Sequence, residues 1–138
     1  EPYNESICEG YLNVLITLIL KSACYGDGKN TNFNHEGLQQ VLSSMNRHFN
    51  EPILLEKYAK MCFVSQNRFI HMFKEYTGVS PYHYQLKVRI DRAVEMLSNT
   101  AISVSDCAEA VGFKDSSYFC RVFKKQTGIT AGEYLKKR

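Results

Sequence analysis

The sequence predicts an all-α protein, with two helix-turn-helix subdomains joined by a long linker helix and an extra helix at the N-terminus. Three observations support this fold class. Residues 63–87 recur in altered form at residues 113–137. Apolar residues recur at spacings of three and four along most of the chain, as amphipathic helices require. No segment shows the strict apolar–polar alternation that is typical of a half-buried strand.

The repeat has an offset of 50 residues, and a repeat of this period indicates a duplicated supersecondary unit. The identical pairs are Phe63/Phe113, Phe69/Phe119, Phe73/Phe123, Lys74/Lys124, Thr77/Thr127, Gly78/Gly128, Tyr84/Tyr134 and Lys87/Lys137. Ala59 and Ala108 align at an offset of 49 instead. One additional residue is therefore expected in the second turn. We expect it to be Gly112, because glycine tolerates backbone angles that other residues avoid.

Composition and charge divide the chain into two parts. The 138 residues are 44% hydrophobic, which favours a packed core over disorder. Residues 1–35 carry two lysines and four acidic residues, whereas residues 36–138 carry fifteen Lys or Arg and ten acidic residues. The basic excess lies in the part that bears the repeat and permits a polyanionic partner.

The N-terminal part contains one predicted helix, over residues 5–24, followed by a loop rich in Gly and Asn over residues 26–34. The helix is apolar around most of its circumference, so it needs a protein partner. Its apolar run is interrupted by Asn13 and Thr17 and is shorter than the ~20 residues of a membrane span.

The spacing of apolar residues and the residues typical of helix ends predict the positions of the remaining helices. We expect them over residues 36–49, 54–62, 66–76, 82–97, 103–111, 116–126 and 131–136. Ser65 and Asp115 are expected N-caps, and Gly78 and Gly128 are expected left-handed C-caps. The two units then span about 54–76 and 103–126. The linker helix spans about 81–98, and its apolar stripe is Tyr82, Leu86, Ile90, Ala93, Val94 and Leu97.

Metal and enzyme chemistry find little support in the sequence. The five cysteines, Cys8, Cys24, Cys62, Cys107 and Cys120, form no C-x-x-C pair, and three of them lie in apolar helical patterns. We expect buried, reduced thiols. The four histidines lack ligand spacing, and the chain has no nucleophile constellation and no phosphate-binding glycine loop. We expect no metal, no cofactor and no enzymatic activity.

The second helix of each unit carries the candidate binding residues. In a helix-turn-helix this helix lies in the major groove of DNA, where its first residues meet base edges. The exposed early positions are Gln66, Asn67, Ile70 and His71 in the first unit, and Ser116, Ser117, Cys120 and Arg121 in the second. Asn and Gln suit adenine, Arg suits guanine, and an apolar side chain suits the thymine methyl. The expected phosphate contacts are Ser65, Lys74, Lys124 and Lys125.

Each of these positions also has a purely structural interpretation. Polar residues on a helix face are usually solvated surface, and Arg121 can pair with an acidic neighbour. The combination of two capped helices with polar first turns favours DNA binding. At ~1.5 Å per residue the linker helix is long enough to hold the two recognition helices about one DNA turn, ~34 Å, apart.

Both copies resemble the AraC/XylS family of bacterial transcription regulators. The second copy carries the signature A-E-A-V-G-F-K-D-S-S-Y-F-C-R-V-F-K-K-Q-T-G-I-T-A-G-E-Y, from Ala108 to Tyr134. The first copy carries a looser form from Tyr58 to Tyr84, followed by Arg89 and Ala93. The resemblance covers Glu36–Arg138. Ala131 departs from it, since the family most often has proline there.

The resemblance implies a seven-helix, two-lobed DNA-binding domain whose base contacts fall on the eight positions named above. It implies a bacterial, cytoplasmic activator that contacts RNA polymerase. It also implies a separate effector or dimerisation domain, of which residues 1–35 are expected to be the last part. The helix over 5–24 then either dimerises or folds back on its own domain. The alternative function is a protein-interaction module that docks on RNA polymerase or another regulator and binds DNA weakly.

Overall fold

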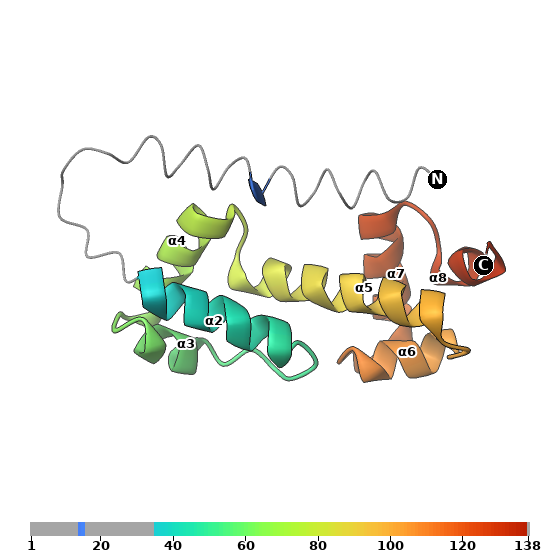
Figure 1. Ribbon diagram of the computed structural model, residues 1–138, viewed down its shortest axis with the longest axis horizontal. Coiled ribbons are helices and arrows are strands. Elements are labelled where there is room, and N and C mark those ends of the chain that lie inside the picture. Colours follow the sequence, from blue (N-terminus) through green and yellow to red (C-terminus); the bar gives the residue numbers. More distant parts are fainter. Residues whose placement is uncertain (1–13, 16–34, 138) are drawn as a thin grey trace.

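The computed structural model describes residues 14–15 and 35–137, and seven helices form the fold of residues 35–137. They are α2 (His35–Arg47), α3 (Leu55–Met61), α4 (Gln66–Thr77), α5 (Pro81–Asn99), α6 (Val104–Ala110), α7 (Ser116–Thr127) and α8 (Ala131–Lys136), shown in Figure 1. Residues 35–137 contain no strand, so the all-α prediction is confirmed. Of the helix predicted over 5–24, the structure describes only Val14 and Leu15, which are helical and exposed. No described helix combines the length and apolar character needed to cross a bilayer.

Two separate hydrophobic cores divide the fold into two lobes. The first lobe, residues 35–80, packs α2, α3 and α4 around Leu38, Met45, Tyr58, Phe69 and Phe73. The second lobe, residues 100–137, packs α6, α7 and α8 around Cys107, Val111, Phe119, Val122 and Phe123. Helix α5 joins the lobes. Its Tyr84 packs on the first core, whereas Leu86, Ile90 and Leu97 belong to the second.

The helix ends follow from side chains that the two copies share. Ser65 and Asp115 cap α4 and α7 as predicted, and Gly78 and Gly128 end these helices with φ of 82° and 81°. Next to these glycines, the Thr77 and Thr127 hydroxyls donate to the carbonyls of Phe73 and Phe123, at 2.8 and 2.7 Å. The repeated Thr-Gly therefore builds the same helix end twice. Helix α8 begins at Ala131 in spite of the missing proline, because Thr130 and Glu133 form a capping box.

The prediction that Gly112 is the additional residue of the second turn is wrong. The N–H of Phe63 bonds the carbonyl of Lys60, and the N–H of Gly112 bonds that of Glu109, which pairs Gly112 with Phe63 at an offset of 49. Both have positive φ, 57° for Phe63 and 94° for Gly112. The offset returns to 50 only at the N-caps, so the extra residue lies at Lys114. Phe63 and Phe113 are thus the same residue type in different structural positions. Phe113 is buried, whereas Phe63 is 87% exposed.

The apolar stripe predicted for the linker helix is wrong at Tyr82. Leu86, Ile90, Ala93, Val94 and Leu97 are buried as expected, but Tyr82 is 52% exposed. It lies in the first turn of α5, before the helix reaches the second core, and its hydroxyl bonds that of Tyr118 on α7 at 3.1 Å. A phenol satisfies this arrangement because one end is apolar and the other can make a hydrogen bond.

The lobes also touch each other directly. Phe49, in the connection between α2 and α3, packs against the second core. The backbone of Asn50 lies so close to Gly112 that a Cβ on Gly112 would stand 2.5 Å from the Asn50 oxygen and 2.8 Å from its Cα. Glycine at position 112 therefore allows both the left-handed turn and the close approach of the first lobe.

Replacing Gly112 with alanine tests this contact. Gly112→Ala should lower the free energy of unfolding by about 2–5 kcal/mol, because a left-handed Cβ costs about 1–2 kcal/mol and overpacking typically adds 1–3. Gly78→Ala is the matched control, since Gly78 also has positive φ but has no atom within 4 Å of the added Cβ. We expect it to cost only about 1–2 kcal/mol in urea unfolding. Equal losses for the two variants would contradict the close approach.

Phe63 is the exposed residue with left-handed φ in the turn of the first copy, and its replacement should stabilise the protein. Phe63→Asn should raise the free energy of unfolding by roughly 0.5–1 kcal/mol, because asparagine tolerates left-handed φ better than other side chains with a Cβ. Little burial is lost, since the ring is 87% exposed. Leu54→Gln serves as control, because Leu54 is also exposed and apolar but has φ of −113°, and glutamine, unlike asparagine, is not a preferred residue at the N-cap position that Leu54 occupies. A gain of the same size at Leu54 would show that surface polarity, and not relieved backbone strain, is responsible.

Candidate nucleic-acid interface

The first turn of α4 presents polar side chains to solvent. The Ser65 hydroxyl accepts a hydrogen bond from the N–H of Arg68 at 3.2 Å and so starts the helix at Gln66. Phe69 and Phe73 are fully buried, which fixes the rotation of the helix about its axis. This rotation leaves three of the predicted base-reading residues exposed: Gln66, Asn67 and His71.

Helix α7 repeats this construction with a different cap. The Asp115 carboxylate accepts a hydrogen bond from the N–H of Ser117 at 2.8 Å. Phe119 and Phe123 are fully buried and fix the rotation. The exposed predicted base-reading residues are Ser116, Ser117 and Arg121.

Two of the eight predicted base-reading residues are only half-exposed. Ile70 packs against the core of the first lobe, and Cys120 packs against the core of the second. They occupy equivalent places, 50 residues apart, at the border of the buried stripe. Each can offer one side of a small apolar group to a ligand. The predicted phosphate contacts Ser65, Lys74, Lys124 and Lys125 are all exposed.

Arg121 is supported by a residue that the sequence analysis did not single out. Its guanidinium lies over the Tyr118 ring, 5.8 Å from the centroid. The Tyr118 hydroxyl bonds that of Tyr82, and this hydrogen bond raises the pKa of Tyr82, so the phenol stays neutral. Tyr118 also contacts the Phe113 ring at 5.8 Å. The sequence contains a signal for this contact, since an aromatic residue lies one helical turn before an exposed arginine.

The recognition helices differ in charge. Helix α7 contains Arg121, Lys124 and Lys125 and no acidic residue, whereas α4 contains Arg68, Lys74 and Glu75. In residues 35–137 no carboxylate forms an ion pair with Arg121 or Lys125. Within the described residues, Arg121 is therefore not half of an ion pair. These cations remain available to an external anion.

The cysteines of the described region are buried or half-buried and are not disulfide-bonded. Cys62 and Cys107 lie in the two cores, and burial raises the pKa of the Cys107 thiol to about 11. Such a thiol is almost entirely protonated at neutral pH and is a poor nucleophile. Cys8 and Cys24 lie outside the described residues. Within residues 35–137, no three His, Cys, Asp or Glu side chains are placed to hold a metal ion.

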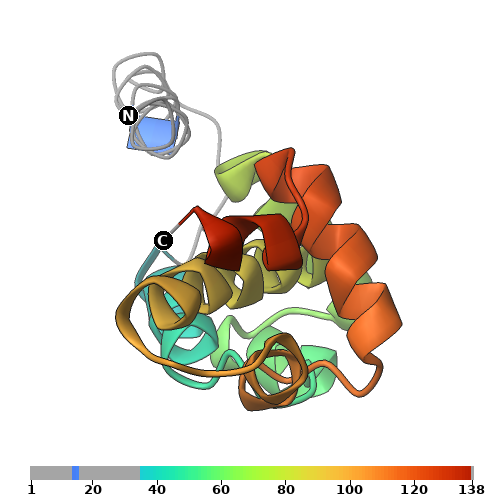
Figure 2. The same ribbon diagram turned by 90° about the vertical axis from the view of Figure 1, so that its right-hand side faces the viewer.

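The two recognition helices lie on one side of the linker helix. Figure 2 looks along α5 and shows α7 on the side of α5 opposite to α2, with α4 rising behind α7. Helix α5 has 19 residues and is therefore ~28 Å long. The arrangement thus presents two capped helices, with polar first turns, to the same face of the molecule.

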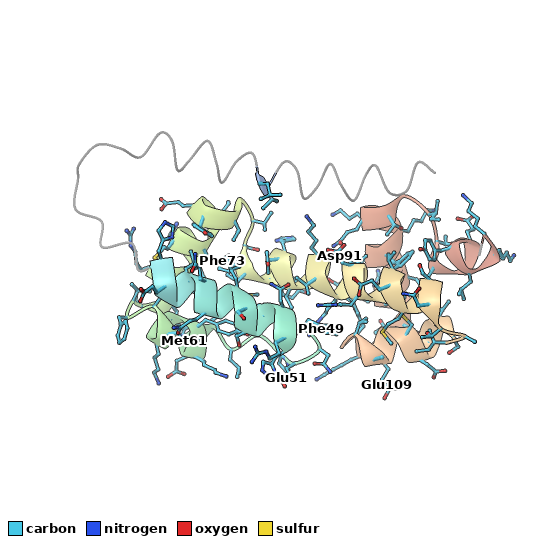
Figure 3. The ribbon with its side chains drawn as sticks, in the orientation of Figure 1. Phe49, Glu51, Met61, Phe73, Asp91 and Glu109 are labelled. Atoms are coloured by element: carbon cyan, nitrogen blue, oxygen red, sulfur yellow. The ribbon has the colours of Figure 1, made fainter. Side chains whose placement is uncertain are left out.

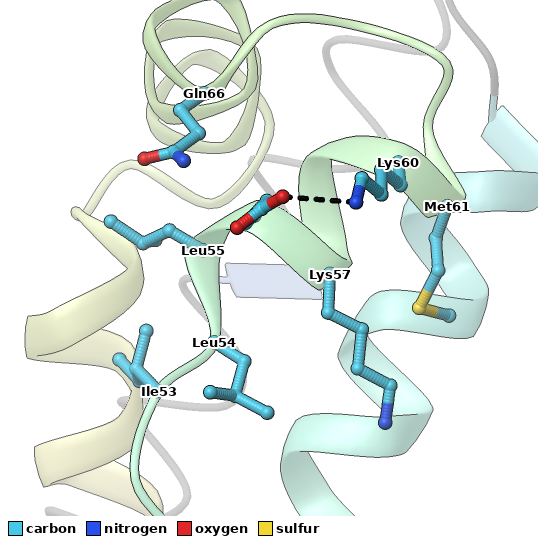
Figure 4. Close-up of a pocket in the computed structure, with 8 residues that line it drawn as sticks. Ile53, Leu54, Leu55, Lys57, Lys60, Met61 and Gln66 are labelled. Carbon is cyan, nitrogen blue, oxygen red and sulfur yellow. Dashed lines mark ion pairs between the residues drawn. The ribbon is translucent and has the colours of Figure 1, made fainter.

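A hollow beside the first unit is lined by side chains of mixed character. Ile53, Leu54, Leu55 and Met61 supply apolar groups, and Lys57, Lys60 and Gln66 line it as well (Figure 4). Lys60 pairs with Glu56 at 2.9 Å on its wall. The lining offers no nucleophile with a neighbouring base, so the hollow has no composition that favours catalysis.

Comparison with known proteins agrees with this geometry. The sequence profile of a helix-turn-helix domain family matches residues 58–137. The transcriptional regulator GbdR of Pseudomonas aeruginosa is 31% identical over 96 residues, which are 70% of this chain and 26% of that protein. The lactose operon transcription activator of Staphylococcus xylosus is 30% identical over 100 residues, or 72% of this chain and 36% of that one. The chain thus spans well under half the length of these curated relatives.

A solved structure shows the same architecture. The AraC-type transcriptional regulator from Chromobacterium violaceum superposes with a TM-score of 0.68 at 26% identity, covering 78% of this chain and 96% of that one. The matched profile begins at Tyr58, inside α3, and extends over the rest of the first helix-turn-helix unit, α5 and the whole second unit. The chain belongs to the AraC/XylS family of transcription regulators and carries the helix-turn-helix DNA-binding domain of that family.

Proposed function

We propose that this domain binds a specific DNA site by placing α4 and α7 in two adjacent major-groove segments. The base-reading residues are Gln66, Asn67, Ile70 and His71 on α4, and Ser116, Ser117, Cys120 and Arg121 on α7. Ser65, Lys74, Lys124 and Lys125 contact phosphates. The observation that carries the proposal is the pair of equivalent capped helices, each with its aromatic stripe buried and its polar first turn exposed on the same side of α5.

The two helices contribute unequally in this proposal. Helix α7 supplies Arg121, whose planar fork matches the two acceptors of guanine in the major groove. The Tyr118 ring restricts the arginine to one side of the helix, which lowers the entropy lost on binding. Helix α4 supplies Ile70 and His71, which discriminate less sharply. The site is therefore asymmetric, with its sharper half under α7.

The wider role follows from the relatives. Proteins that resemble this chain include the lactose operon transcription activator of Staphylococcus xylosus and the transcriptional activator RhaR of Enterobacter sp.. We therefore propose that this regulator activates transcription in the bacterial cytoplasm by contacting RNA polymerase beside its site. In this proposal residues 1–35 are the last part of an effector or dimerisation domain, and the predicted helix over 5–24 either supplies a dimer contact or packs on its own domain.

Substitution of one arginine and one lysine tests the assignment of roles. After selection of a preferred site from random DNA, Arg121→Ala should relax preference at one base pair by about 1–3 kcal/mol. Lys124→Ala should weaken binding to selected and random DNA alike. It should also reduce the slope of log K against log salt by about 0.9, the contribution of one phosphate contact. Affinities of both variants are measured by fluorescence anisotropy across a salt series.

Two outcomes would contradict the proposal. If Arg121→Ala loses the same affinity for selected DNA as for random DNA, Arg121 does not read a base. A flat salt response of the wild-type protein, or no binding at low salt, would favour the alternative function, a module that docks on RNA polymerase or another regulator.

A further inference from the structure

The guanidinium of Arg89, in the middle of α5, hydrogen-bonds to both lobes. Its Nε donates to the Phe49 carbonyl at 2.7 Å and its Nη2 to the Glu51 carbonyl at 2.9 Å, both after α2 of the first lobe. Its Nη1 donates to the Gly112 carbonyl at 2.9 Å, in the turn before α7 of the second lobe. We call these three hydrogen bonds the Arg89 clamp.

The clamp lies at the contact between the two lobes. Phe49 and Glu51 lie at the end of α2 that faces the second lobe (Figure 3). The neighbouring Asn50 backbone packs onto Gly112. The Arg89 guanidinium also lies 5.7 Å from the centre of the Phe113 ring. Gln85, one turn earlier on α5, adds a bond to the Glu51 carbonyl at 2.7 Å.

Apart from the clamp and the Phe49, Asn50 and Gln85 contacts beside it, the first lobe is held by the early part of α5. The later residues of α5, Leu86, Ile90 and Leu97, belong to the core of the second lobe. The first lobe meets α5 through Tyr84, whose ring contacts Phe73 and whose hydroxyl accepts a bond from Asn46 at 3.1 Å. These contacts lie near one end of the helix, so they leave rotation of the lobe about that end weakly opposed.

We infer that Arg89 sets the spacing between the two recognition helices and thereby the spacer length of the DNA site that the protein accepts. This inference rests on the proposed function, in which α4 and α7 bind two segments of one site. Arg89 is then a positioning residue, because it acts through the placement of the two lobes and is itself turned toward backbone carbonyls.

Whether the clamp can limit the spacer length depends on how far one base pair displaces a half-site compared with the range of a hydrogen bond. One base pair moves a half-site ~3.4 Å along the DNA axis and turns it by roughly 35°, since a turn holds 10–10.5 base pairs. Hydrogen bonds of 2.7–2.9 Å are lost once the atoms separate beyond about 3.5 Å. The intact clamp therefore cannot follow even one inserted or deleted base pair. Guanidinium is well suited to this task, because its donors lie in one rigid plane.

The test compares three duplexes with three proteins. The duplexes carry the selected site, and the same site with its spacer lengthened or shortened by one base pair. The proteins are wild type, Arg89→Gln and the control Arg92→Gln. Arg92 lies on the same helix and carries the same charge, but among the described residues it forms no hydrogen bond to the backbone of either lobe. It bonds Glu95 at 3.2 Å and lies 5.6 Å from the centroid of the Phe49 ring, so this variant controls for the loss of a cation beside Phe49 without loss of the clamp.

Wild type and Arg92→Gln should bind the altered spacers at least about tenfold more weakly than the selected site, because one recognition helix loses its base contacts. For Arg89→Gln this penalty should fall to roughly threefold or less, mainly through weaker binding of the selected site. The ratio between duplexes is the readout, since a general loss of stability lowers all three affinities together.

Each result decides the inference. If Arg89→Gln keeps the wild-type penalty, the clamp does not set the spacing, while the proposed function stands. If wild type binds all three duplexes equally, the two-segment mode of binding fails and the inference fails with it. If Arg89→Gln does not fold, Arg89→Lys carries the test, because lysine keeps the charge but lacks the planar fork. An unchanged penalty in that variant overturns the inference, and a reduced one supports it.

Discussion

The Arg89 guanidinium donates hydrogen bonds to two carbonyls of the first lobe and one of the second, and the relative position of α4 and α7 depends on this contact. The two lobes have separate cores, so hydrophobic packing stabilises each lobe but only weakly relates one to the other. Burial lowers the pKa of Arg89 from its ordinary value, yet a guanidinium remains charged in proteins. Bonds from a charged donor are stronger than neutral ones.

The contact also explains why two copies of one unit are no longer equivalent. In the first copy the left-handed turn residue is Phe63, whose side chain is 87% exposed. In the second copy the equivalent residue is Gly112, whose missing side chain admits Asn50 and whose carbonyl binds Arg89. The turn of one copy is a free surface, and the turn of the other is part of the contact between lobes. Lys114, the extra residue, follows directly after this contact.

Local features were predictable from the sequence, because their causes lie within a few residues. Apolar spacing located the described helices to within two residues at most ends, and Ser65, Asp115, Gly78 and Gly128 were recognisable as caps. Exposure of Gln66, Asn67, Ser116 and Ser117 followed from burial of the phenylalanines that come after them on the same helices, one helical turn apart. Contacts across the chain were not predictable in this way. The placement of Gly112 and the exposure of Tyr82 depend on Asn50 and Tyr118, which lie 62 and 36 positions away. The Tyr118 support of Arg121 is local and leaves a sequence signal, whereas the hydrogen bond from Tyr82 that holds Tyr118 comes from 36 positions away and leaves none.

The central claim is that the two recognition helices are held in one relative position before DNA arrives. A distance distribution from pulsed electron paramagnetic resonance measures this directly, with spin labels at exposed Glu75 of α4 and Gln126 of α7. Cys8 and Cys24 are replaced by serine, and Cys120 by alanine, which keeps a small apolar group at this base-reading position. We expect one narrow distribution in the free protein that does not move when DNA is added. A broad or multiple distribution that narrows only with DNA would contradict it, because DNA would then set the spacing instead of Arg89.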